Sequence, residues 1–140
     1  MKLHSGWLAA GLLLFAVLAC NVTKNPSSSG LISEGHMAKD DNGDPGDKTN
    51  TFSPSDHTIH CVVTAKDPQE GMRFKFTWSA VDAGGVKNEK LKDMEITLPG
   101  SDKNLVHAHL ISPRDWASGK YKCEVEVNDK LEQSIDFWVK

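Results

Sequence analysis

The sequence KYKCEVEV, residues 120–127, places apolar and cysteine side chains on one side of an extended chain and charged side chains on the other. Such alternation is typical of a half-buried β-strand, because successive side chains of a strand point to opposite faces. The same period of two recurs before and after this segment, in groups of residues that share a face: Ile59, Cys61, Val63 and Ala65; Met72, Phe74, Phe76 and Trp78; Met94, Ile96 and Leu98; Val106, Ala108 and Leu110; and Leu131, Ile135, Phe137 and Val139.

Turn-forming residues separate these runs: Asp67-Pro68, Gly84-Gly85, Pro99-Gly100-Ser101-Asp102 and Asn128-Asp129. About seven short strands in one segment of this length predict an all-β fold, a single β-sandwich over residues 55–140.

Cys61, Trp78 and Cys123 follow one another in the Cys…Trp…Cys order of immunoglobulin domains, and Tyr121 lies two residues before the second cysteine. The stretch LISPRDWASGKYKC, residues 110–123, resembles the end of strand E, the E–F turn and strand F of that fold. The chain is therefore similar to the immunoglobulin-like family. The resemblance implies that Trp78 lies in the core and that Tyr121 forms the tyrosine corner.

The N-terminus has the pattern of an export signal. Lys2 precedes an apolar run at residues 7–19, WLAAGLLLFAVLA, which is too short to span a membrane as a helix. The run ends in Val17-Leu18-Ala19-Cys20, which resembles the lipobox of bacterial lipoproteins. This resemblance implies removal of residues 1–19, acylation of Cys20 and anchoring in the cell envelope, at the outer membrane of a Gram-negative host because Asn21 follows the cysteine. The alternative is an ordinary secretory signal with the same cleavage site.

The chain has three cysteines. With Cys20 assigned to lipid, Cys61 and Cys123 remain as an even pair in an exported, oxidising setting, and the immunoglobulin resemblance implies a disulfide between them. The alternative is two buried free thiols that face each other across the sandwich.

Residues 20–54 are dominated by Ser, Gly, Asn, Asp, Pro and Lys, and their few apolar residues show no period. We expect a flexible linker there, because such a segment buries too little to offset the entropy of ordering it. Asp40, Asn42 and Asp44 have the spacing of a calcium loop, but Pro45 and Thr51 occupy positions where the loop needs glycine and glutamate. A solvated linker is the favoured interpretation.

Three histidines form the most suggestive cluster. His60 points outward on the predicted strand that holds Cys61, and His107 and His109 point outward on the strand at residues 105–110. Those strands correspond to B and E, which are neighbours in the immunoglobulin topology, so the three imidazoles would share one face and could bind zinc, copper or nickel. His57 could join them. The alternative is a set of polar residues on a wet sheet face.

Two tryptophans are candidates for partner contact. Trp138 points away from the predicted core, and Trp116 lies in the E–F turn; exposed tryptophans are enriched at binding surfaces. Alternatively, Trp116 covers the bottom of the sandwich and the linker shields Trp138.

The formal net charge of −3 and the absence of a basic cluster argue against nucleic acid as a partner. No nucleophile turn, phosphate-binding glycine loop or carboxylate pair predicts catalysis, and no cofactor is expected. The sequence thus predicts a non-catalytic lipoprotein that the membrane holds through its N-terminal lipid, with an immunoglobulin-like module that binds a protein or glycan or serves as a structural subunit. The alternative is a metal-binding lipoprotein that uses the three histidines.

Overall fold

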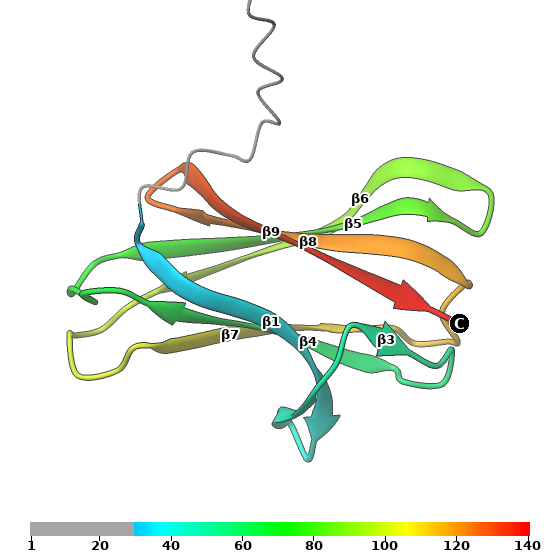
Figure 1. Ribbon diagram of the computed structural model, residues 1–140, viewed down its shortest axis with the longest axis horizontal. Helices are drawn as coiled ribbons and strands as arrows, with labels where there is room; N and C mark the ends of the chain where they lie inside the picture. The colour runs from blue at the N-terminus through cyan, green and yellow to red at the C-terminus, as the bar shows by residue number, and fades with distance from the viewer. Residues whose placement is uncertain (1–29) are drawn as a thin grey trace, which may run out of the picture.

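Two β-sheets pack face to face in the computed structural model, which describes residues 30–140 (Figure 1). The predictions for the signal peptide and for Cys20 lie outside these residues. One sheet has four strands, in the order β2 (Asp44–Lys48), β1 (Ile32–Asp41), β4 (Thr58–Ala65) and β7 (Leu105–Ile111). The other has five, in the order β3 (Thr51–Phe52), β9 (Lys130–Val139), β8 (Gly119–Val127), β5 (Arg73–Ala83) and β6 (Val86–Thr97).

The predicted β-sandwich is confirmed. Strand β4 pairs with β7, and β8 lies between β5 and β9. These are the neighbours that strands B and E, and strands C, F and G, have in the immunoglobulin fold. No helix in the part of the chain that the structure describes is long and apolar enough to cross a membrane.

The core lies between the sheets and is filled by the inward side chains of the alternating strands. Trp78 is its largest fully buried side chain. The Trp78 ring meets Phe137 edge-on at a centroid distance of 6.2 Å, and Tyr121 stacks on Phe137 at 5.4 Å. Such aromatic pairs add to the stabilisation from buried apolar area.

The expectation of a flexible linker up to residue 54 is wrong for residues 32–52, which form β1, β2 and β3. Met37 and Phe52 are each only 1% exposed, and the Phe52 ring packs edge-on against Phe137. Two irregularities in β1, one in its pairing with β4 near Ile32 and one in its pairing with β2 near Ala38, break the regular alternation. An interrupted period hides a strand from pattern analysis.

Candidate functional site

His60, His107 and His109 meet on the outer face of the four-stranded sheet. His60 on β4 lies directly opposite His109 on β7, and Val62 lies opposite His107. The ring centroid of His60 is 5.4 Å from that of His109 and 5.7 Å from that of His107. The three histidines share one face, as the strand order expected from the sequence predicted. The alternative of polar residues on a wet sheet face does not hold for His60, which is 0% exposed.

Asp40 on β1 makes the principal polar contact of this cluster. Its Oδ1 lies 2.6 Å from His60 Nε2. Because an ionised carboxylate can only accept, the Nε2–H group of His60 donates this hydrogen bond. This hydrogen bond lowers the pKa of Asp40, and the N–H of Gly43 in the β1–β2 turn lowers it further. Burial lowers the pKa of His107, and the nearby His60 adds to that effect. The cluster thus joins a carboxylate to three imidazoles, of which His107 has a lowered pKa.

The geometry does not support the predicted metal site. Among residues 30–140, no group of three or more His, Cys, Asp or Glu side chains is arranged to hold a metal ion. His57 does not join the cluster, because its Nε2 lies 2.8 Å from Asp115 Oδ1 at the end of the sandwich. Two of the residues with the spacing of a calcium loop lie where β1 turns into β2: Asp40 is near the end of β1, and Asn42 is in the turn.

Trp116 closes one end of the sandwich. Its indole N–H donates to the carbonyl oxygen of Asp56 at 2.8 Å, and its ring meets Tyr121 edge-on at 5.6 Å. These contacts support the alternative prediction for Trp116, that it covers the bottom of the sandwich rather than contacting a partner. Trp138 is half-buried on β9 with Lys120 Nζ 5.8 Å from its ring centroid, so part of the indole remains available to a partner.

The two core cysteines lie face to face. Cys61 on β4 and Cys123 on β8 are both fully buried and are free thiols in this structure. Burial and a hydrogen bond with Cys61 raise the pKa of the Cys123 thiol well above its ordinary value. Nearby, the Tyr121 hydroxyl donates to the carbonyl oxygen of Ala117 at 2.6 Å, as in a tyrosine corner. The predicted disulfide stays a prediction.

A cavity of about 360 Å³ opens between β1, the segment after β2, and β9. It is lined by Gly35, His36, Met37, Lys48, Thr49, Asn50, Ile135 and Asp136. Its volume falls within the range of small-molecule sites. Because the sequence predicted a linker where β1 and β2 lie, it gave no sign of this cavity.

A residue of β1, Glu34, holds one of the polar side chains that line the cavity, Lys48. Lys48 Nζ is held 2.7 Å from Glu34 Oε1, and this hydrogen bond lowers the pKa of Glu34. Burial, followed by the charge of Lys48, lowers the pKa of His36. Lys48 and Asn50 carry donors and Asp136 carries an acceptor that is paired with Lys120 Nζ at 3.5 Å, while the Thr49 hydroxyl donates to the carbonyl oxygen of Thr51. The half-buried Ile135 adds an apolar side chain to the lining. The arrangement suits a ligand that carries both donors and acceptors.

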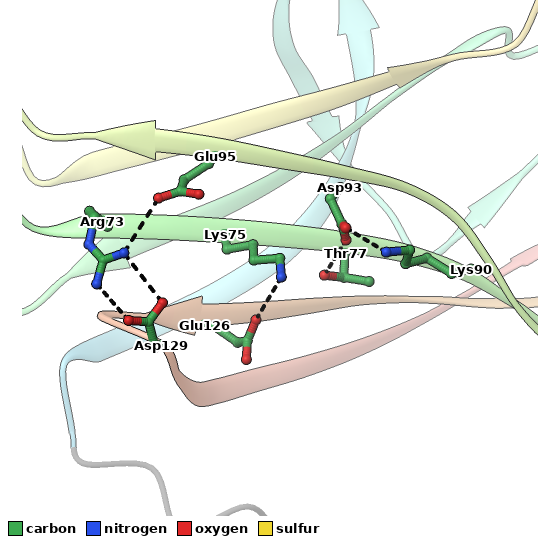
Figure 2. A network of polar contacts seen from close by, with 8 residues as sticks. All are labelled: Arg73, Lys75, Thr77, Lys90, Asp93, Glu95, Glu126 and Asp129. Carbon is green, nitrogen blue, oxygen red and sulfur yellow. Dashed lines mark hydrogen bonds and ion pairs between the residues drawn. The ribbon is translucent and has the colours of Figure 1, made fainter.

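The outer face of the five-stranded sheet carries ion pairs within β6, between neighbouring strands and between β5 and the β8–β9 turn (Figure 2). Its contacts join Arg73 to Asp129 and Glu95, Lys75 to Glu126, and Lys90 and Thr77 to Asp93. The shortest, Arg73 Nη2 to Asp129 Oδ2 and Lys90 Nζ to Asp93 Oδ2, are both 2.6 Å. Exposed pairs of this kind contribute little to stability. The pairing leaves this face with mixed charge rather than a single sign.

Comparisons with known proteins identify no family. No family model matches the sequence, and no curated protein matches it. Among solved structures, the chain is similar to an alkylpurine DNA glycosylase AlkC from Pseudomonas fluorescens, at 15% identity and a TM-score of 0.41 over 65% of this chain and 28% of that one. It is also similar to a β-glucosidase from Listeria innocua, at 13% identity and a TM-score of 0.47 over 76% of this chain and 16% of that one. The chain spans less than a third of either protein, and likeness at this level carries no functional argument.

Proposed function

We propose that this protein is a lipid-anchored lipoprotein of the bacterial cell envelope whose immunoglobulin-like sandwich is a non-catalytic binding module. The observation that carries the anchor is the lipobox-like sequence Val17–Cys20, with only residues 21–30 between Cys20 and Leu31, which immediately precedes β1. Ten residues span at most about 35 Å. A lipid on Cys20 would therefore hold the sandwich close to the membrane.

The start of β1 defines which end of the sandwich would face that membrane. The turns at 66–72, 98–104 and 128–129 lie at the same end as the start of β1, on the left in Figure 1. The Lys66 N–H donates to the carbonyl oxygen of Leu31 at 2.8 Å, which ties the β4–β5 turn to this end. The loops at 84–85 and 112–118 lie at the opposite end and would point away from the membrane.

The cavity between β1 and β9 is the best candidate for the ligand site. Its donors and acceptor surround apolar side chains of the chain interior. The backbone of Trp138 lies next to it, because the backbone N–H of Trp138 donates to the carbonyl oxygen of Asn50 at 2.8 Å. A hydroxyl-rich ligand with an apolar ring face matches such a surface, so we favour a glycan over a polypeptide segment.

The anchor is tested by fractionating cells that express the full chain and its Cys20→Ala variant. We expect the parent protein in the membrane fraction, with an intact mass that begins at Cys20 and includes acyl chains. The variant should appear in the soluble exported fraction. Continued membrane attachment of the variant would refute the lipid anchor.

The ligand site is tested by screening the full chain against an array of envelope glycans and repeating any binding with Lys48→Ala and Asp136→Asn. Each variant should weaken binding at least tenfold, because each removes a charged group that lines the cavity. Lys75→Ala, on the outer face of the five-stranded sheet, is the matched control and should bind like the parent. Binding that survives both cavity variants would place the ligand elsewhere.

A further inference from the structure

Strand β7 is an unprotected sheet edge. It is the last strand of the four-stranded sheet and, among residues 30–140, pairs with β4 alone. Its sequence, LVHAHLI, holds no Asp, Glu, Lys, Arg or Pro. Its register with β4 runs without a bulge from Thr64↔Leu105 to Thr58↔Ile111. Native edges normally carry charges, prolines or bulges that prevent pairing with another chain.

Strand β6, one of the two edge strands of the other sheet, has the protection that β7 lacks. Its pairing with β5 is broken by a bulge between Trp78 and Ser79. Its side chains are mostly exposed and include alternating charges, at Lys87, Glu89, Lys90, Lys92 and Asp93. The contrast between the two edges indicates that β7 is left open for a partner strand.

The hydrogen bonds that flank β7 show which of its backbone groups face outward. The carbonyl oxygen of Asn104 accepts from the Ala65 N–H at 2.7 Å, and the Ser112 N–H donates to the carbonyl oxygen of His57 at 2.8 Å. Because hydrogen bonding alternates along an antiparallel strand, the even-numbered residues direct their backbone groups to β4. The N–H and C=O groups at the open edge therefore belong to the odd-numbered residues: Leu105, His107, His109 and Ile111.

We propose that β7 pairs antiparallel with β7 of a second copy of this chain, about a two-fold axis through Ala108, to join two four-stranded sheets into one. In this register, Leu105 faces Ile111 of the second copy and His107 faces its His109. Every outward backbone group then lies in a hydrogen-bonded pair. A two-fold interface requires a surface that complements itself, and the near-palindromic order of residues 105–111 meets that condition.

The side chains around β7 fit the same register. Leu105 is 54% exposed and Ile111 is 61% exposed, which makes them the two most exposed large apolar side chains of residues 30–140. The two-fold pairing brings them together at both ends of the strand, where each covers the other.

The test compares two double variants that carry charges at the same exposed positions. In Leu105→Lys/Ile111→Lys, lysine faces lysine of the second copy at both ends of the strand. In Leu105→Lys/Ile111→Glu, lysine faces glutamate instead. Each full-length chain is measured by sedimentation velocity in a density-matched neutral detergent over a range of protein concentrations. The readout does not depend on the ligand site or on whether Cys20 is acylated.

We expect the parent chain to dimerise, the Lys/Lys variant to be at least tenfold weaker in self-association, and the Lys/Glu variant to dimerise again. Both positions are exposed, so the three monomers should melt at similar temperatures when measured at concentrations too low for the parent to dimerise. A parent chain that stays monomeric at every concentration overturns the proposal. So does a dimer that the Lys/Lys variant leaves unchanged, or a Lys/Glu variant that is as weak as Lys/Lys.

Discussion

Asp40 Oδ1 and His60 Nε2 lie 2.6 Å apart, and their hydrogen bond ties the far end of β1 to a fully buried imidazole on β4. The remaining nitrogen of this ring, Nδ1, has no hydrogen-bond partner among the described residues. The buried imidazole therefore depends on Asp40 for its polar contact. A buried polar group that loses its hydrogen-bond partner lowers the stability of the folded state. Loss of Asp40 should therefore reduce the free energy of unfolding, even though Asp40 itself lies near the surface.

Replacing Asp40 by Asn should destabilise the fold at neutral pH, and the difference from the parent should shrink in acid. The native pKa of Asp40 lies below its ordinary value of 3.8 because His60 donates to the carboxylate. Its contribution is therefore complete above about pH 3.8 and is lost as the pH falls toward the native pKa. Urea unfolding from pH 7 to pH 3 measures this. Asp41→Asn, at the neighbouring exposed position, is the control, because it leaves the hydrogen bond between Asp40 and His60 in place, and it should unfold like the parent.

If the protein is exported as proposed, the thiols of Cys61 and Cys123 should be joined by a disulfide when it is isolated from its native host. The structure places them in contact in the core, and a bridge there would stabilise the fold by about 4 kcal/mol in the chain-entropy model. Alkylation of the denatured chain, read by intact mass, should label these two residues only after reduction. Labelling of both without reductant would show that the exported protein keeps free thiols.

Trp78→Ala should cost about 3–5 kcal/mol of stability, because it empties the largest buried site of the core. Trp138→Ala is the matched control. It removes a half-buried indole and a cation–π contact with Lys120, so it should cost about 1 kcal/mol or less. Thermal and urea unfolding separate the two. Equal losses would mean that Trp78 is not the centre of the core.

Gly119→Ala should destabilise the protein by more than about 2 kcal/mol. The φ angle of Gly119 is +148°, and an added Cβ would collide with the carbonyl oxygen of Asp82 and lie 2.6 Å from Ala83 Cα, both of them backbone atoms that cannot turn aside. Gly43→Ala is the control, since Gly43 also has a positive φ but open space around it. It should cost only about 1 kcal/mol. Equal losses in urea unfolding would remove the close backbone approach as the cause.

The sequence predicted the β-sandwich because the residue types of β4, β5 and β8 alternate, and in β8 every second side chain is buried. In β4 and β5, outward-facing residues such as His60 and Ser79 are buried as well. It missed β1 to β3 because bulges interrupt the period and because polar residues surround the buried Met37 and Phe52. The same omission concealed the cavity beside Lys48. Pattern analysis brought the three histidines to one face, but it could not show that His60 is fully buried, since that depends on contacts between strands distant in the sequence.

The parallel pairing of β3 with β9 has a consequence for when the fold can form during synthesis. Thr51 lies beside Trp138, and the Lys140 N–H donates to the carbonyl oxygen of Phe52 at 3.0 Å. One edge of the five-stranded sheet therefore joins a strand made early in synthesis to one made much later. Contacts so distant in the sequence form slowly and only when both segments are present. A nascent chain that lacks β9 cannot complete this sheet or close its core, so the sandwich forms only after β9 has been synthesised.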